Sequence, residues 1–402
     1  MPETSWLQGT SPAFRMMIAT SWLAPACWQE KQEEAIREAI GAGLDWMEYL
    51  RLVERHRTPA LSWAALKRVP GLEIPDEARQ PLQKRSEACR MQAVKHSMLL
   101  AGVLKSFHRA AIPVMTLKGP LLSLELYGDV GLRQSHDLDL ACAPGDILRA
   151  QACLEKMGWR PDSTYFPMSP RQWESCLRHE HHLGFVYSPG GCLLELHWRH
   201  QSDDPGLTSA RWARSIPSVW QGRSHQAMNP IDQVLYLCSH GGEHAWCRAK
   251  WLGDLARIHA QGNVDWEAVL GEAQRSGQQR ALLAGLRLLK DVHGLPLPGL
   301  PGNPWKNLPS FLIDRPLDAL KAPEEPTVPG ALATLPEQFR INRYNRLLLP
   351  QKTWRESLAE LAYSHADLQV LRLPDSLFWA YAPLRPILWL WRRVLRRRPA
   401  NR

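Results

Sequence analysis

The chain has 402 residues, of which 45% are hydrophobic and 22% are charged, and this length allows two or three globular domains of about 100–200 residues each. No stretch approaches the roughly 18–20 uninterrupted apolar residues of a membrane-spanning helix, which excludes a transmembrane channel or carrier. The formal net charge is +9, and 37 of the 49 basic residues are arginine. Arginine pairs bidentately with phosphate and carboxylate, so this excess favours an anionic partner, although a GC-rich genome explains it equally well.

The eight cysteines are scattered along the chain and form no CxxC pair. We therefore expect neither a zinc ribbon nor a disulfide framework, and we predict a reduced cytoplasmic protein. The apolar run at 16–27 resembles the core of an export leader, but it is short and interrupted by Thr20 and Ser21. We do not predict export on this basis.

Helical periodicity dominates from about residue 30 to residue 110. Its clearest part predicts a single apolar helix face, made by Val94, Met98, Leu99, Val103, Leu104 and Phe107. Between 112 and 198 the pattern changes to short apolar runs that alternate with a helical segment, which predicts a sheet domain of the α/β or α+β class. Strands are expected at 112–117, 137–142, 183–187 and 192–198, a helix at 146–157, and a hairpin turn at 188–191.

Helical periodicity returns at 230–293 and again at 345–373. Residues 294–336 are rich in proline and glycine, which predicts an irregular linker. The chain ends in an aromatic and arginine-rich tail. The predicted division is an N-terminal helical region at 1–90, a sheet core at 91–225, a helical domain at 226–300, a linker at 301–340, and a C-terminal helix with the tail at 341–402.

Asp137 and Asp139 are the most informative pair in the sequence. Alternate side chains of a strand lie on one face, so these two carboxylates project together while Leu138 and Leu140 point into the core. Buried like charges are costly unless a cation neutralises them or one of them is protonated, so the pair is a candidate metal site. A solvated strand end is the alternative, because the DxD tripeptide is common.

The neighbouring residues favour the metal site. Gly119 follows a predicted strand and opens a helix, where backbone N–H groups favour an anion, and Lys118 and Arg133 add positive charge. On the later predicted strand, Glu195 and His197 share a face. Three carboxylates on adjacent strands would suit a two-metal site.

Three motifs together resemble the nucleotidyltransferase superfamily, which includes DNA polymerase beta, and more closely a bacterial family of uncharacterised nucleotidyltransferases. The motifs are Leu117-Lys118-Gly119, the segment 133–140, and Glu195-Leu196-His197-Trp198. The resemblance extends over roughly residues 30–300. It implies an α+β fold, in which a small mixed nucleotidyltransferase sheet is flanked by an N-terminal helical region and a C-terminal helical domain.

The resemblance also implies a function and a set of site residues. The chain would be an enzyme that moves a nucleoside monophosphate from an NTP to an acceptor and releases pyrophosphate, with Mg²⁺, or Mn²⁺ in its place, as cofactor. The catalytic and metal-binding residues would be Asp137, Asp139 and Glu195. The nucleotide-binding residues would be Lys118, Gly119, Arg133 and His197.

Two departures from the superfamily pattern motivate an alternative function. Pro120 replaces the serine or glycine that usually follows the glycine, and seventeen residues separate Gly119 from Asp137. The alternative is a non-catalytic nucleotide-binding or scaffold protein that kept the fold. The sequence does not identify the acceptor, and a small molecule, a glycan precursor, a peptide, a protein and a tRNA are all compatible with it.

Several histidines allow two interpretations. The run His179-Glu180-His181-His182 suggests a zinc site, but HExxH is absent and we favour a polar segment at the rim of the site. His197 would orient Glu195, contact phosphate or assist proton transfer, or it would be structural. His240 and His244 lie one helical turn apart, where we favour helix packing or a substrate wall over metal binding.

The tryptophans are dispersed and are predicted to pack the core, except in the tail. There, aromatic residues precede five arginines between 392 and 398, a composition that suits peripheral contact with an anionic membrane. Pro383 and Pro386 are expected to break a helix, which favours a solvated or partner-docking tail instead. No motif for specific nucleic-acid recognition accompanies these arginines. The expected location is the cytoplasm, with membrane association as the further possibility.

Overall fold

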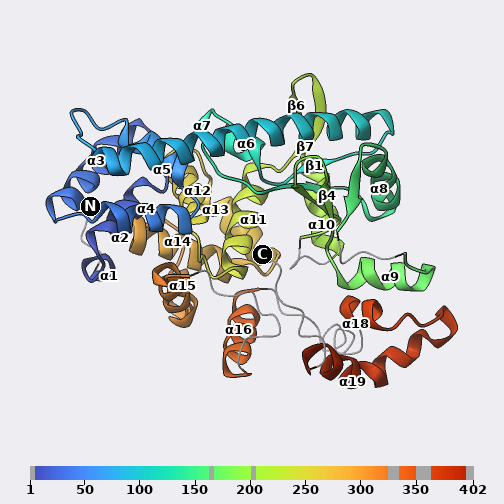
Figure 1. Cartoon of the computed structure of the whole chain (residues 1–402). Coiled ribbons are helices and arrows are strands. Elements are labelled where there is room, and N and C mark those ends of the chain that lie inside the picture. The colour runs from blue at the N-terminus through green and yellow to red at the C-terminus, as the bar shows by residue number, and fades with distance from the viewer. Residues whose placement is uncertain (1–4, 163–166, 201–204, 325–334, 350–363, 395–402) are drawn as a thin grey trace.

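The computed structural model describes residues 5–162, 167–200, 205–324, 335–349 and 364–394 (Figure 1). A helical body and a sheet domain lie side by side, and one long helix runs along both. The N-terminal part of the helical body consists of α1 (Ser5–Gln8), α2 (Pro12–Thr20), α3 (Ala26–Gly41), α4 (Trp46–Arg55) and α5 (Pro59–Leu66).

The C-terminal part of the helical body is made by α11 (Pro230–Glu243), α12 (Ala249–Ala260), α13 (Trp266–Arg275) and α14 (Gln279–His293). This confirms the helical periodicity at 230–293. The two parts share one core, in which Met17 and Ile18 of α2 pack with Leu252 and Leu286. The leader-like run at 16–27 thus begins as a buried helix. The boundary predicted at 90 divides a continuous helix. The predicted regions 1–90 and 226–300 contribute to one core.

Helix α6 (Asp76–Arg109) joins the helical body to the sheet domain. Leu82 lies in the core of the helical body, whereas Leu104 lies in the core of the sheet domain. The predicted apolar face is wrong for Val94 and Met98, which are 53% and 71% exposed. The buried stripe is Leu100, Val103, Leu104 and Phe107, and at 100° per residue Val94 and Met98 fall on the opposite side of the helix.

The sheet has seven strands in the order β3-β4-β5-β2-β1-β7-β6. They are β1 (Met115–Thr116), β2 (Asp137–Ala141), β3 (Trp159–Pro161), β4 (His182–Tyr187), β5 (Cys192–His197), β6 (Ile216–Trp220) and β7 (Arg223–Ala227). The strands expected at 137–142, 183–187 and 192–198 are confirmed, as is the hairpin between β4 and β5. The strand expected at 112–117 contains only two residues in regular strand conformation. Strands β3, β6 and β7 were not predicted from the sequence.

One face of the sheet is apolar and buried. Leu138 and Leu140 of β2 and Leu194 and Leu196 of β5 pack there against α6 and against α8 (Ile147–Lys156), the helix predicted at 146–157. The remaining elements of this domain are α7 (Pro120–Tyr127), the 3-10 turn η1 (Pro144–Asp146), α9 (Pro170–His179) and α10 (Pro205–Ala213). The mixed strand pairing confirms the α+β class.

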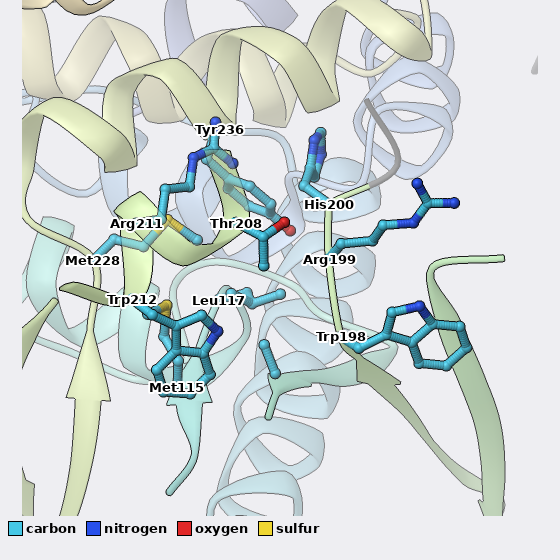
Figure 2. Close-up of a pocket in the computed structure, with 11 residues that line it drawn as sticks. Met115, Leu117, Trp198, Arg199, His200, Thr208, Arg211, Trp212, Met228 and Tyr236 are labelled. Atoms are coloured by element: carbon cyan, nitrogen blue, oxygen red, sulfur yellow. The ribbon is translucent and has the colours of Figure 1, made fainter. Parts of the chain in front are cut away.

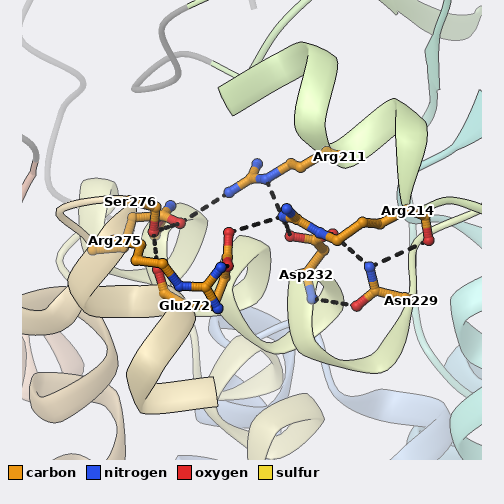
Figure 3. A network of polar contacts seen from close by, with 9 residues as sticks. Arg211, Arg214, Asn229, Asp232, Glu272, Arg275 and Ser276 are labelled. Atoms are coloured by element: carbon orange, nitrogen blue, oxygen red, sulfur yellow. Dashed lines mark hydrogen bonds and ion pairs between the residues drawn. The ribbon is translucent and has the colours of Figure 1, made fainter. Parts of the chain in front are cut away.

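Helix α10 is tied to the helical body by a network of charged side chains (Figure 3). Arg214 donates to both carboxylate oxygens of Asp232, at 2.8 and 3.1 Å, and reaches Glu272 of α13 at 2.9 Å. Asp232 itself is 1% exposed and also accepts from Asn229 at 2.6 Å. The network fixes the sheet domain relative to α11 and α13.

The segment predicted as an irregular linker contains a helix, so that prediction is wrong over Phe311–Lys321 (α15). Leu312 and Leu320 of α15 are buried in the core of the helical body, which stabilises the helix despite its internal Pro316. A 3-10 turn, η2 (Pro304–Asn307), precedes it, and α16 (Leu335–Leu348) follows. Of the helix predicted at 345–373, residues 350–363 lie outside the described part of the chain.

The tail is folded as far as Val394. It comprises α18 (His365–Val370), η3 (Asp375–Ala380) and α19 (Tyr381–Val394), which lie beside α9 (Figure 1). Contrary to prediction, the prolines do not break α19: Pro383 occupies its first turn, and Pro386 removes a single helical hydrogen bond. Arg392 pairs with the buried Asp367 at 2.8 Å. Across the described residues, no helix has both the length and the apolar character needed to span a membrane.

Candidate active site on the polar face of the sheet

The polar face of the sheet brings together the predicted acidic residues. Strands β2 and β5 pair in parallel, and the register sets Asp139 beside Glu195 and Asp137 beside Leu193. Residues that are paired in register project from the same face of a sheet. Asp139 is 2% exposed, whereas the side chain of Glu195 is about one-third exposed at 35%. The pair thus combines a buried carboxylate with one that an incoming ligand can reach.

His197 lies between these two carboxylates. Its Nε2 atom is 3.2 Å from Oε2 of Glu195 and 3.5 Å from Oδ1 of Asp139. Burial disfavours the imidazolium form, but the two carboxylates outweigh burial and raise the pKa of His197. Burial likewise acts against the charged form of Glu195, but His197 and His182 outweigh it and lower the pKa of the carboxyl to about 2. Glu195 is therefore ionised at neutral pH.

Lys118 supplies a second cation to Asp139. Its Nζ atom is 3.1 Å from Oδ1 of Asp139, and its side chain is 11% exposed. Burial opposes the ammonium charge, but Asp139 outweighs burial and raises the pKa of Lys118. Burial raises the pKa of Asp139 less than Lys118 and His197 lower it, so the carboxyl stays charged. The ion pair keeps both charges in a nearly buried position.

The carboxylates fit a divalent cation by their chemistry. One ligand atom from each of Asp139, Glu195 and His197 lies within 4.8 Å of the others. Oδ1 of Asp139 faces Lys118 and His197, whereas its Oδ2 atom has no hydrogen-bond partner among the described residues, which is unusual for a buried carboxylate oxygen. Asp137 lies at the edge of this group and accepts from Ser135 Oγ at 3.3 Å. Magnesium prefers oxygen ligands of this kind.

Gly119 positions the backbone at the start of α7. Its φ of 78° and ψ of −145° lie in a region that only glycine enters freely, and Pro120 occupies the first helical position. A Cβ atom at residue 119 would lie 3.7 Å from the Asp137 carbonyl oxygen, so the turn runs directly beside β2. The predicted phosphate-binding turn is therefore adjacent to the carboxylates.

Arg133 has a different partner from the one predicted. Its guanidinium is 2% exposed and pairs with the fully buried Asp254 of α12 at 2.8 Å. Its backbone N–H donates to Ser123 Oγ at 3.0 Å. The Arg133–Asp254 pair joins the sheet domain to α12, and a nucleotide contact of Arg133 stays a prediction.

Basic side chains from outside the predicted motifs also approach Asp137. Lys250 of α12 is 5% exposed, and its Nζ donates to the Gln134 carbonyl at 2.9 Å. Burial and the neighbouring cations Arg133, Arg248 and Arg57 lower the pKa of Lys250 well below its usual value. Lys250 and Arg248 lie two residues apart at the start of α12, so the sequence could have indicated them together, whereas Arg57 comes from a distant segment.

Tyr236 of α11 closes the other side of Lys118. The Lys118 Nζ lies 5.9 Å from the centre of the Tyr236 ring, which borders a cavity of about 30 Å³ (Figure 2). The cavity is also lined by Met115, Leu117 and Thr208, and its size corresponds to about one water molecule. The ring of His240 stacks on Tyr236, and both His240 and His244 pack on Trp251. This arrangement matches the packing interpretation of the two histidines.

Comparison with known families identifies the chain. Residues 42–294 match a family described as uncharacterised nucleotidyltransferase. The chain belongs to this family. The matched segment contains all seven residues predicted for the nucleotidyltransferase site, together with Lys250, and it ends with α14. Searches of curated proteins and of solved structures gave no match.

Proposed function

We propose that this nucleotidyltransferase moves a nucleoside monophosphate from an NTP to an acceptor hydroxyl, with a divalent cation as cofactor and pyrophosphate as the leaving group. The observation that carries the proposal is the parallel register of β2 and β5, which gathers Asp139, Glu195 and His197 beside the Gly119 turn. Membership of the nucleotidyltransferase family supports the same reaction class.

Asp139 and Glu195 would hold the cation, with Asp137 as the third carboxylate at the edge of the site. Mg²⁺ is the proposed ion and Mn²⁺ would replace it, because both accept oxygen ligands. When bound, such an ion offsets the negative charge of the phosphates and helps to ionise the attacking hydroxyl. The buried position of Asp139 keeps its carboxylate in one place before substrate arrives.

The triphosphate would lie between the Gly119 turn and the basic side chains of α12. Lys118 would exchange Asp139 for a phosphate oxygen when a cation takes over the Asp139 charge. A phosphate bound beside Lys250 would favour its ammonium form and so offset the burial and neighbouring cations that lower its pKa, and Arg248 and Arg57 are near enough to Lys250 to add positive charge. Phosphoryl chemistry depends mainly on positioning and charge neutralisation, which these residues supply.

In the proposed reaction the acceptor oxygen forms a bond to the α-phosphorus while the bond from the α-phosphorus to the α,β-bridging oxygen breaks. The hydroxyl proton of the acceptor passes to solvent water, and pyrophosphate leaves with the bridging oxygen. His197 lies close enough to Glu195 to keep that carboxylate oriented toward the reacting phosphate. The acceptor would bind against the helical body, whose helix α12 packs against α7 beside the Gly119 turn.

The test is incubation with each α-labelled NTP, Mg²⁺ and extract of the host cell, followed by identification of the labelled product. The parent protein is expected to label one acceptor class, and Asp139→Asn and Glu195→Gln to reduce labelling at least 100-fold. Glu174→Gln serves as the control, because Glu174 is an exposed carboxylate on α9. Saturable NTP binding without any labelled product or pyrophosphate would contradict the proposal and favour the non-catalytic alternative.

A further inference from the structure

Three histidines meet at the end of the β4–β5 hairpin that lies opposite its turn. His181 and His182 belong to the run that the sequence suggested as a zinc site, and His197 ends β5. One nitrogen from each of the three rings lies within 4.8 Å of the others. His181 and His182 play no part in the proposed transfer reaction, so their position calls for a separate explanation.

The register of the hairpin explains how the rings come together. His182 pairs with His197 across the antiparallel strands, so both side chains project from one face. His181 precedes the strand, and its carbonyl accepts from the Trp198 backbone N–H at 3.0 Å. The ring centres of His181 and His182 lie 5.9 and 5.1 Å from that of His197. Backbone pairing therefore places the three rings near one another without direct bonding between them.

Two ring nitrogens in this group lack ordinary partners. His197 is 6% exposed; its Nε2 atom faces the two carboxylates, whereas its Nδ1 atom has no hydrogen-bond partner among the described residues. The Nδ1 atom of His182 likewise has none in that part of the chain. Buried polar atoms of this kind usually have a partner, so a missing ligand is a direct explanation.

A carboxylate borders the three rings. Glu195 adds negative charge beside them, with its Oε1 atom 4.0 Å from His182 Nε2 and its Oε2 atom 3.2 Å from His197 Nε2. Negative charge next to imidazole nitrogens favours a bound cation, and imidazole is a common ligand of transition metals.

We propose that His181, His182 and His197 form a binding site for a zinc-like transition-metal ion, distinct from the oxygen site at Asp139 and Glu195. Three imidazoles favour zinc over magnesium, and three protein ligands leave a fourth position for water or Glu195. The site adjoins the proposed transfer site and shares His197 with it. The proposal does not rest on the transfer reaction.

The experiment uses the full chain after chelator dialysis, titrated with Zn²⁺ and with Co²⁺ as a spectroscopic probe. The parent is expected to bind one equivalent of Co²⁺ with the intense visible absorption of low-coordinate cobalt, and Zn²⁺ but not excess Mg²⁺ should abolish that absorption. His181→Ala and His182→Ala should each weaken Co²⁺ binding at least tenfold. His179→Ala is the matched control from the same run and should bind as the parent does.

Asp139→Asn separates the two overlapping groups, because Asp139 belongs only to the carboxylate group and His181 only to the imidazole group. Asp139→Asn should keep Co²⁺ affinity within about threefold of the parent. Loss of binding in Asp139→Asn with retention in His181→Ala would overturn the proposal, as would absence of the visible absorption in the parent. Thermal melting of His181→Gln, which keeps a polar side chain, distinguishes a lost ligand from a misfolded hairpin.

Discussion

At the scale of single residues, the site is a balance of buried charges. Asp139 is nearly inaccessible and faces Lys118 at 3.1 Å and His197 at 3.5 Å. Removing one partner of a buried ion pair costs more than the pair itself contributes, because the remaining charge stays buried. The pair therefore maintains a charged carboxylate in a place where a solitary one would take up a proton.

Lys250 tests the basic side of the site. Lys250→Met removes the buried amino group beside the Gln134 carbonyl while keeping a side chain of similar length. If Lys250 contacts the triphosphate, the Kd for NTP should rise about tenfold or more, equivalent to about 1.4 kcal/mol. Equilibrium binding of a labelled NTP measures the change.

Lys105→Met is the matched control for Lys250→Met, because Lys105 is exposed on α6. It should leave the Kd for NTP unchanged. Equal affinity in Lys250→Met and the parent would remove Lys250 from the nucleotide site. Melting curves of the two variants show how much stability Lys250→Met loses with the contact between Lys250 and the Gln134 carbonyl.

The acidic residues of the site were predictable from the sequence, whereas the basic ones were largely not. Strand alternation places Asp137 with Asp139 and Glu195 with His197, and alternation is a local property of the chain. Lys250 approaches Asp137, and Arg57 approaches Lys250, only because segments distant in the sequence pack beside β2. Arg133 has a buried partner, Asp254, that lies more than one hundred residues away.

At the scale of elements, local periodicity predicted where the helices lie but not which side is buried. Helix α6 crosses from one core to another, so no single stripe is apolar along its whole length. Strand β6 was not predicted because it is an edge strand that contains Pro217. Strand β7 was not predicted because its residues are mainly polar. Their place in the sheet depends on pairing with each other and with β1.

The orientation of α6 gives a direct stability prediction. Leu104→Ala should destabilise the protein by about 2–5 kcal/mol, because Leu104 is fully buried in the sheet domain. Met98→Ala should change stability by less than about 0.5 kcal/mol, because Met98 is 71% exposed. Urea unfolding of both variants measures the difference. Similar losses of unfolding free energy in the two variants would support the apolar face predicted from periodicity.

The network in Figure 3 gives a second prediction for the elements. Asp232→Ala removes the buried carboxylate that accepts from Arg214 and Asn229 and should cost about 1–3 kcal/mol, because Arg214 is 36% exposed and keeps its ion pair with Glu272. Glu174→Ala, which breaks the exposed pair with Arg178, should cost less than about 1 kcal/mol. Thermal unfolding compares the two variants. An equal, small effect would show that the network does not hold α10 to the helical body.

At the scale of the whole molecule, the N-terminal segment completes the core of the family region. Trp22 packs edge-on against His293 of α14, with ring centres 5.7 Å apart. Gly253 lets α12 approach the same segment, since a Cβ there would lie 2.6 Å from the Ser21 carbonyl oxygen. The matched family segment begins at residue 42, so part of its core comes from residues outside it.

His293 makes the stability of this core depend on pH. Burial lowers the pKa of His293 from 6.5 to about 3, so the folded protein holds it neutral. The unfolded chain binds the proton more readily, and stability contributed by neutral His293 is full above pH 6.5 and lost as pH falls toward 3. Each pH unit in that window removes up to about 1.4 kcal/mol.

Urea unfolding of the parent and of His293→Leu at pH 7 and pH 4.5 tests this dependence. The parent should lose about 2–3 kcal/mol more than the variant between the two pH values. The comparison cancels titration of the other groups, which both proteins share. Equal losses in the parent and the variant would show that His293 is not held neutral.

The central claim is that Asp139 and Glu195 serve transfer of a nucleoside monophosphate. The most direct measurement uses one NTP labelled either at the α- or at the γ-phosphate, with Mg²⁺ and the acceptor fraction found by labelling. We predict that the acceptor gains label only from the α-phosphate, that one pyrophosphate is released for each transfer, and that Asp139→Asn abolishes both. Label transferred from the γ-phosphate, or transfer that persists at the parental rate in Asp139→Asn, would contradict the claim.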